Sequence, residues 1–304
     1  MDGRAGIELS DFGALFSGAG AEDIESQMLS PYSSMQKGTD SVELELRLID
    51  DFPNHPFKVI DDAKMDELVE DIKKFGVVHP VVVRESRDGR YEMISGHRRT
   101  YASRKAGKKT IPARIMNLSD EDAVILMTNT NFLQRTEIKP SEKAKAYRMK
   151  YDAIKRQGRA GGSSLDEIGE AAKESGKTVQ RFIRLSYLSE DLLGLVDKNK
   201  LGISQGVEIS YLDEIHQILV YEVIVGMKTT ISRDQAILIK KAYQDGKLSL
   251  EKMNQIICRS NVERVVSLKA ETINEFFGEE VSSEEAESII ISLLTKWKGE
   301  NGCG

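Results

Sequence analysis

Residues 91–107 decide the fold, and they read YEMISGHRRTYASRKAG. The first five have strand propensity and run directly into Gly96, after which a basic helix is expected from about His97 to Ala106, with Gly107 ending it. Glycine lets the backbone approach a ligand closely, and the N-terminus of the following helix presents free N–H groups and a partial positive charge. This strand–glycine–helix turn therefore favours an anion site.

Two arginines strengthen that prediction. Arg98 and Arg99 carry planar guanidinium groups that suit phosphate oxygens, so the turn favours a di- or triphosphate. The alternative is a tight strand-to-helix corner with two surface arginines. His97 can polarise a phosphate, but a single histidine at a helix start is more often a capping or surface residue, and we adopt that interpretation.

Hydrophobic periodicity extends an α/β domain on both sides of the turn. Residues 42–48 alternate apolar and polar, which predicts a half-buried strand. Residues 65–75 have helical spacing and Gly76 follows them as a stop, while residues 77–83 and 111–116 read as strands rich in β-branched side chains. From about residue 119 onward the pattern is helical.

A second motif predicts a helix-turn-helix. Residues 164–167 form a capping box at the start of a short helix, and a break follows around residues 174–177. The next helix places Val179, Phe182 and Ile183 inward. Arginine and glutamine side chains on its other face can pair with base edges in the major groove. The outward residues are Lys177, Gln180, Arg181 and Arg184. The alternative is a plain helical hairpin with a solvated basic face.

Charge is unevenly distributed along the chain. The net charge is -6, yet residues 84–109 carry 9 basic and 3 acidic side chains and residues 139–187 carry 12 basic and 6 acidic. DNA affinity depends on local Lys and Arg density, not on the whole-chain sum. Both basic segments are compatible with double-stranded DNA as a partner, and ordinary solvated helix faces are the alternative.

Composition excludes several other classes. The 304 residues suffice for about two domains. Cys258 and Cys303 lack the spacing of a zinc site or a disulfide framework. Without a signal-peptide pattern or an apolar run long enough for a bilayer, we expect a cytoplasmic protein with no membrane partner.

Four segments, in order, resemble the ParB/RepB family of plasmid and chromosome partition proteins over about residues 43–215. Residues 75–84 are similar to the first family box, and residues 96–99 to the Gly-Glu-Arg-Arg phosphate box. Residues 133–144 are similar to the third box, and residues 164–185 align without gaps to the helix-turn-helix. The implied fold class is an α+β N-terminal ParB/sulfiredoxin-like domain followed by an all-α helix-turn-helix region.

The resemblance implies functions and site residues. Family members bind CTP with Mg²⁺, dimerise, clamp on DNA at a centromere-like site and work with a ParA-type ATPase. The corresponding nucleotide-binding positions here are Gly96, His97, Arg98, Arg99, Asn131, Gln134 and Arg135. Those expected to face DNA are Lys177, Thr178, Gln180, Arg181 and Arg184.

Several residues depart from the family pattern. His97 stands where the family usually has Glu, and Asn131-Phe132 stands where it has Glu-Asn. A hard cation prefers carboxylate oxygen, so Mg²⁺ binding stays open and we expect CTP hydrolysis to be slow or absent. Gly169 and Lys173 replace the small residue and the turn glycine that are usual in the helix-turn-helix.

The expected domain organisation has four parts. They are a disordered tail (1–40), the nucleotide-pocket domain (41–118), a helical region (119–215) with the helix-turn-helix at 164–187, and a C-terminal helical region (216–304). The last part is expected to mediate homodimerisation through an apolar stripe of Ile289, Ile290, Leu293, Leu294 and Trp297.

Two alternative functions remain open. One is a transcription or nucleoid-occlusion regulator of the same architecture. The other is an enzyme, since sulfiredoxin and ParB-like nucleases use related domains. Sulfiredoxin chemistry needs a cysteine where this turn has Ser95-Gly96-His97, and a metal nuclease needs a carboxylate cluster that the segments around Gly96 and Gln134 do not show.

Overall fold

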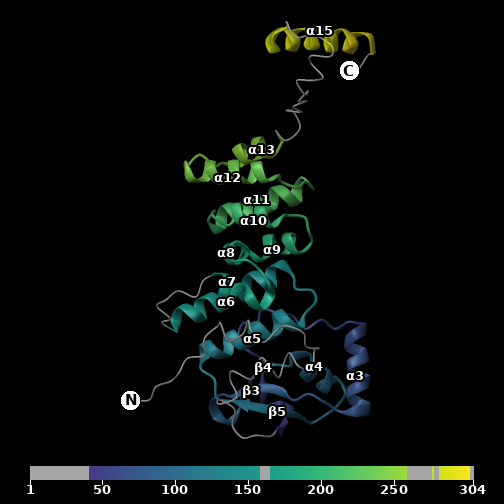
Figure 1. Ribbon diagram of the computed structural model, residues 1–304, viewed down its shortest axis with the longest axis vertical. Helices are drawn as coiled ribbons and strands as arrows, with labels where there is room; N and C mark the ends of the chain where they lie inside the picture. The colour runs from purple at the N-terminus through teal and green to yellow at the C-terminus, as the bar shows by residue number, and fades with distance from the viewer. Residues whose placement is uncertain (1–40, 158–164, 259–275, 277–280, 302–304) are drawn as a thin grey trace. The chain divides into compact units, whose positions relative to one another are not determined.

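The computed structural model describes residues 41–157, 165–258, 276 and 281–301 (Figure 1). Contacts divide the chain into two units, residues 1–257 and residues 258–304. Among the described helices, none is both long enough and apolar enough to cross a lipid bilayer.

A five-stranded mixed sheet begins the first unit, with strand order β1-β5-β3-β4-β2. β1 and β5 pair antiparallel, as do β3 and β4, while β3–β5 and β2–β4 are parallel. The strands are β1 (Val42–Glu45), β2 (Ile49–Asp50), β3 (Val81–Glu85), β4 (Tyr91–Ser95) and β5 (Thr110–Met116).

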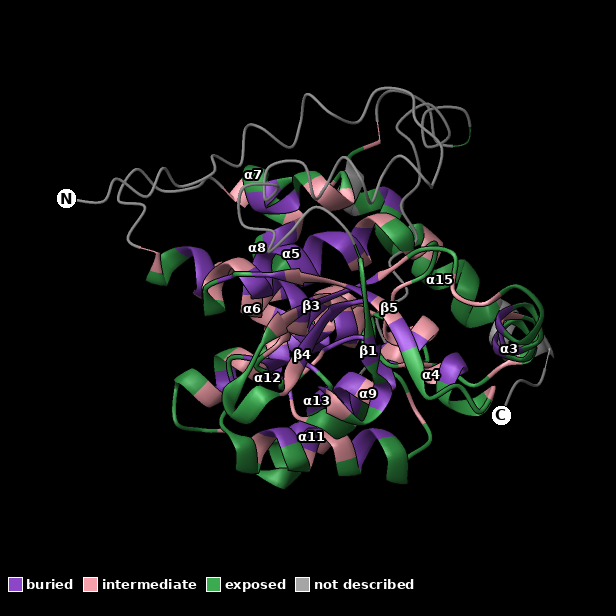
Figure 2. Ribbon diagram, turned by 90° about the horizontal axis from the view of Figure 1, so that it is seen from below, coloured by how far each residue is buried: buried purple, intermediate pink, exposed green. Residues whose placement is uncertain are grey.

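Alternating side chains of the sheet enter two different cores. Val81, Val83 and Met93 pack on one face. Val82 and Ile94, their neighbours in sequence, pack on the other face with the helices that follow. This is the period-2 alternation expected of strands, and here both faces are covered by apolar groups. Figure 2 shows β3 and β4 largely in the buried colour.

The strands predicted for residues 42–48 and 77–83 differ in their bounds from those that the structure forms. Residues Leu46–Leu48 form a 3-10 helix instead of continuing β1, and the Arg104 guanidinium takes the Leu46 and Ile49 carbonyls at 3.4 and 2.9 Å. The strand predicted from residue 77 begins only at Val81. Pro80 has no N–H group to donate a hydrogen bond to a neighbouring strand, and its carbonyl accepts one from Arg99 at 2.9 Å.

Two helices flank the sheet in this domain. α3 (Ala63–Phe75) begins at Asp62, whose carboxylate accepts from the Met65 N–H, and ends at Gly76 with φ 76°. Met65, Val69 and Ile72 pack against Ala102 of α4 (His97–Lys105). The helical spacing and the glycine stop predicted for residues 65–76 are confirmed.

From α5 onward, the described residues of the first unit form helices, as predicted. A continuous core runs from one face of the sheet through these helices. They are α5 (Asp120–Gln134), α6 (Pro140–Arg156), α7 (Leu165–Gly169), α8 (Gly176–Leu185), α9 (Glu190–Asp197), α10 (Ile203–Ile209), α11 (Glu214–Gly226), α12 (Arg233–Gln244) and α13 (Leu250–Cys258). In the second unit the structure describes α15 (Ser283–Asn301).

The predicted helix-turn-helix corresponds to α7 and α8. Ser164, the first residue of the predicted capping box, lies outside the described residues. Ser175 begins α8, and its side chain accepts from the Thr178 N–H. A Cβ at Gly169 would lie 2.1 Å from the Glu174 carbonyl oxygen, so this departure from the family pattern is required by the turn itself. Lys173 has φ 55°, the left-handed conformation in which glycine is less strained.

Candidate phosphate-binding cavity and DNA-facing helix

The turn between β4 and α4 depends on Gly96. This residue has φ 108° and ψ 21°, a left-handed conformation, and no side chain caps the helix that it begins. A Cβ here would lie 2.6 Å from Cγ1 of Val81 on the neighbouring strand. The turn thus leaves room for backbone only, and the first N–H groups of α4 are presented without a capping side chain.

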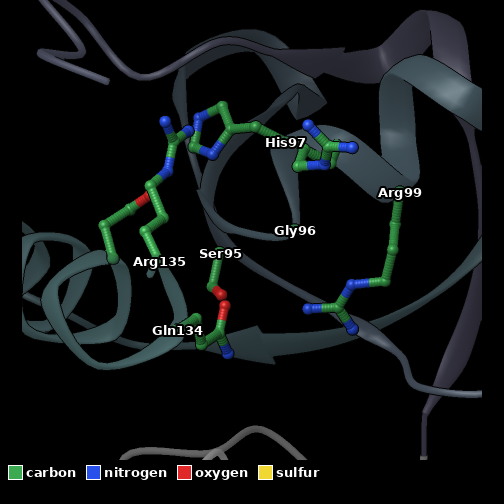
Figure 3. Close-up of a pocket in the computed structure, with 8 residues that line it drawn as sticks. Ser95, Gly96, His97, Arg99, Gln134 and Arg135 are labelled. Atoms are coloured by element: carbon green, nitrogen blue, oxygen red, sulfur yellow. The ribbon is translucent and has the colours of Figure 1, made fainter. Parts of the chain in front are cut away.

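A cavity of about 180 Å³ opens at this turn. Figure 3 shows α4 and the last turn of α5 contributing its side chains. Its lining consists of Ser95, Gly96, His97, Arg98, Arg99, Asn131, Gln134 and Arg135. All seven residues predicted for the nucleotide site therefore meet at one cavity, although they come from segments about 35 residues apart. Their role in binding a nucleotide stays a prediction.

The cationic side chains of the cavity are held in place by protein oxygen atoms. Arg99 donates to the His79 and Pro80 carbonyls at 2.7 and 2.9 Å. Arg98 lies 3.6 Å from the Asp62 carboxylate. None of the eight lining residues is acidic, so the cavity suits an anionic ligand.

Arg135 is a partly buried cation held by two protein oxygen atoms. Its guanidinium donates to the Asn131 side-chain oxygen and to the Lys58 carbonyl, both at 3.1 Å. Burial lowers the pKa of Arg135, and the charge on Arg98 acts in the same direction while Glu142 opposes it. A negatively charged ligand would offset this destabilisation.

The sequence analysis missed His55. Its ring stacks on the His97 ring with centroids 3.8 Å apart and an interplanar angle of 30°. Its Nδ1 donates to the Phe57 carbonyl at 2.7 Å, while Nε2 of both histidines is buried without a hydrogen-bond partner. No motif marks residue 55, because its partner lies 42 positions away and only the tertiary fold brings the two rings together.

Burial determines the protonation of this histidine pair. It lowers the pKa of His55 to about 4, against the opposing hydrogen bond to the Phe57 carbonyl. It lowers the pKa of His97 to about 3, with His55 and Arg135 acting in the same direction. Both rings are therefore neutral at pH 7. The interpretation of His97 as a capping or surface residue is wrong, because Gly96 is the cap and the histidine lines the cavity.

The residues present fit a polyphosphate. The glycine turn admits only backbone, three guanidinium groups border the cavity, and the unpartnered Nε2 of His97 is a buried polar atom available to a ligand. They do not fit a protein-bound Mg²⁺, since no carboxylate lines the cavity. Across the described parts of the chain, no three His, Cys, Asp or Glu side chains converge closely enough to hold a metal ion.

The second candidate surface is the outer face of α8. Lys177, Gln180 and Arg181 are exposed on it, and Thr178 belongs to the cap at its start. Nη2 of Arg181 donates a hydrogen bond to Oγ of Ser204 at the beginning of α10, at 2.6 Å. Apolar residues on the opposite side of α8 pack into the core, so the orientation predicted for this helix holds.

Arg184 differs from the other predicted DNA-facing residues. Its guanidinium donates to the side chain and the carbonyl of Ser210 at 3.0 and 2.6 Å. It also lies 3.8 Å above the Tyr211 ring. Arg184 therefore links α8 to the segment after α10, an interaction that helical spacing alone does not reveal.

The fold and these two surfaces define a class: an α+β domain with an anion cavity, joined to a helical region that contains a helix-turn-helix. Residues 32–132 match the model of the ParB N-terminal domain. Residues 32–132 thus match a ParB N-terminal domain, and the chain is similar to chromosome-partitioning ParB proteins, which confirms the resemblance seen in the sequence.

Several individual proteins are similar to this chain. A probable chromosome-partitioning protein ParB from Vibrio cholerae is 25% identical over 219 residues, which cover 72% of each chain. A nucleoid occlusion protein from Listeria innocua is 42% identical over 120 residues, 39% of this chain and 42% of the relative. The Caulobacter crescentus ParB bound to its centromeric parS site has 19% identity and a TM-score of 0.39, covering 72% of this chain and 100% of that one.

Proposed function

We propose that this chain is a sequence-specific DNA-binding partition protein that recognises a centromere-like site on a plasmid or chromosome. The observation that carries the proposal is the exposed basic and amide face of α8, supported from behind by a packed apolar face. Lys177 contacts phosphate, and Gln180 and Arg181 read base edges. The names of the relatives support this assignment.

The cavity at Gly96 binds a nucleoside triphosphate, with CTP as the nucleotide. The physical support is the glycine turn and the cations Arg98, Arg99 and Arg135 around a cavity without acidic residues. The choice of cytosine comes from the family resemblance alone. The nucleotide makes DNA binding responsive, and hydrolysis is slow or absent because no carboxylate is available to hold a catalytic metal.

The protein acts as a dimeric clamp on DNA. The C-terminal region supplies the dimer contact, and residues 119–215 supply the DNA contact. On α15, Ile289, Ile291, Leu293 and Leu294 are exposed by 43, 55, 59 and 60%. Exposed apolar side chains on a helix commonly mark a protein interface. A ParA-type ATPase moves the complex, which resides on nucleoid or plasmid DNA.

One experiment tests the proposed function against its main alternative. The 42% identity to a nucleoid occlusion protein over 120 residues favours a chromosome-bound regulator as the second candidate. Genome-wide crosslinking should show signal spreading over kilobases from a single site, as partition-type clamping requires. Many dispersed sites indicate nucleoid occlusion, narrow promoter peaks indicate a transcription regulator, and no enrichment contradicts specific DNA binding.

A further inference from the structure

The segment between β2 and α3 touches both the cavity and the helical region. His55 stacks on His97, and the Phe57 ring lies 5.2 Å below the Arg135 guanidinium carbon. The backbone of Lys58 connects Arg135 to Glu142 of α6. Its carbonyl accepts from Arg135 at 3.1 Å, and its N–H donates to the buried Glu142 carboxylate of α6 at 2.8 Å. A displacement of Arg135 by a ligand therefore acts directly on α6.

From Phe57 an aromatic column continues through the core to the recognition helix. We define the column as Phe57, Phe132, Tyr147 and Phe182. The centroids of successive rings are 5.8, 4.7 and 6.0 Å apart. These separations are those of interacting aromatic pairs. Each ring belongs to a different segment, so the column joins the cavity side of the domain to α8.

Phe132 lies on the turn of α5 that also lines the cavity. Asn131, Gln134 and Arg135 of the same turn border the cavity, while Phe132 is buried and stacks on Tyr147 of α6 at an interplanar angle of 29°. Protein cores are close-packed, so a shift of this turn on ligand binding cannot leave the Tyr147 ring unaffected.

The Tyr147 hydroxyl contacts the turn of the helix-turn-helix. It donates to the Glu174 carboxylate at 2.9 Å, and Lys143 pairs with the other oxygen of that carboxylate at 2.7 Å. Burial, reinforced by the negative charge of Glu174, raises the pKa of Tyr147, so the hydroxyl remains a donor. Glu174 lies between Lys173, with its left-handed backbone, and Ser175, the cap of α8.

We propose that Tyr147 is a positioning residue: through Phe132 on one side and Glu174 on the other, it makes the position of the helix-turn-helix turn depend on whether the cavity is occupied. The inference rests on the proposed nucleotide function and names the contacts through which the nucleotide acts on the DNA-binding element. The coupling is reciprocal, so DNA bound at α8 changes nucleotide affinity by the same factor by which the nucleotide changes DNA affinity.

Hydrogen exchange of the backbone amides in residues 165–176 tests this proposal in the full-length chain. With CTP at saturation, established by calorimetry, exchange in this segment should change in the wild type. Tyr147→Phe keeps the stacked ring and removes only the hydroxyl. It should reduce the CTP-dependent change at least threefold, while CTP affinity stays within twofold.

Two control variants separate coupling from general loosening. Tyr151→Phe removes a hydroxyl one turn along α6 and should behave as the wild type. Lys143→Met breaks the ion pair with Glu174 but keeps the hydrogen bond from Tyr147. It should raise exchange with and without CTP alike and preserve the difference between the two. Phe132→Leu tests the same path from α5 and replaces Tyr147→Phe if that variant does not fold.

Each outcome has a distinct meaning. A full CTP-dependent change in Tyr147→Phe overturns the proposal, and so does CTP binding in the wild type without any change in residues 165–176. In both cases the proposed nucleotide function stands. Absence of CTP binding in the wild type overturns the nucleotide function and this inference together.

Discussion

The cavity and the outer face of α8 are both basic, but their cations are held very differently. In the cavity, Arg99 and Arg135 are fixed on backbone carbonyls at 2.7 to 3.1 Å. On the outer face of α8, the cations Lys177 and Arg181 are exposed to solvent, and Arg181 is hydrogen-bonded to the Ser204 hydroxyl at 2.6 Å and not to backbone. The cavity is thus the more preorganised of the two surfaces, whereas on the proposed DNA face the Lys177 side chain must become ordered on binding. Substitutions that change the shape of the site should therefore affect ligand affinity most at the cavity. At α8, substitutions that change charge should affect it most.

The largest effect is expected from Gly96→Ala. A Cβ at this position would be 2.6 Å from Val81 Cγ1, and φ 108° is unfavourable for alanine. We expect CTP affinity to fall by roughly 100-fold or more, equivalent to about 3 kcal/mol. Calorimetry measures the loss, and thermal unfolding shows whether the domain remains folded.

Gly107→Ala is the matched control. Gly107 also has positive φ, 74°, but nothing lies within 4 Å of a Cβ built there. The substitution should cost about 1–2 kcal/mol of stability from backbone strain and leave CTP affinity unchanged. If both variants lost the same CTP affinity, the close contact of a Cβ at Gly96 with Val81 would not be the cause of the loss.

On the DNA face the expected effect is smaller and depends on salt. Arg181→Ala should cost roughly 1–3 kcal/mol on the specific site if it reads a base edge. Lys177→Ala should weaken binding to all duplexes alike and lower the slope of log K against log salt by about 1. Titrations of fragments recovered by crosslinking measure both. An unchanged affinity in Arg181→Ala and Gln180→Ala would remove α8 as the recognition helix.

The histidine pair makes stability depend on pH. Since burial lowers the pKa of His55 to about 4 and of His97 to about 3, the unfolded chain binds more protons than the folded one between pH 6.5 and these values. Stability is fully present above pH 6.5 and falls as pH drops. The loss is about 2 kcal/mol per histidine by pH 5.

Urea unfolding at pH 7, 6 and 5 measures this slope. The double variant His55→Gln, His97→Gln should flatten it. CTP at saturation should also reduce it in the wild type, because bound phosphates favour the protonated rings. If the free energy of unfolding had the same pH dependence in the wild type and the double variant, groups other than these histidines would determine the loss of stability at acid pH.

The smallest effect concerns Mg²⁺. No acidic residue lines the cavity, so the protein offers the ion no carboxylate and the arginines neutralise the phosphates instead. Replacing Mg²⁺ by EDTA should change CTP affinity by less than roughly threefold, about 0.6 kcal/mol. A tenfold or greater loss would show that the cavity binds the metal complex, as a family-type pocket would.

Local patterns predicted the elements whose causes are local. The strand, glycine and basic helix of residues 91–105 and the glycine stop of α3 follow from propensity and capping, and the structure has them where expected. The cavity lining was also predicted, but Asn131, Gln134 and Arg135 were assigned to it by the resemblance to the ParB/RepB family and not by a local pattern.

What the sequence could not provide depends on contacts far along the chain. Residues 46–48 form a 3-10 helix instead of extending β1, and Arg104, 55 or more residues away, donates to the carbonyls of Leu46 within this helix and Ile49 after it. His55 contacts His97 of the cavity lining only because tertiary folding brings the segment before α3 against the start of α4. Arg184 has the helical position of a DNA-facing residue, yet Ser210 and Tyr211 engage it. Periodicity says which side of a helix a residue occupies, and tertiary packing decides what it meets there.

Lys173 gives this molecule an adjustable position for protein engineering. It is exposed and has φ 55°, in the middle of the helix-turn-helix turn, where a left-handed conformation costs a non-glycine residue about 1–2 kcal/mol. Its side chain lies on neither the apolar core nor the outer face of α8. Glycine or asparagine at this position would therefore relieve the backbone strain and alter the stiffness of the turn while leaving the proposed DNA-reading surface of α8 intact.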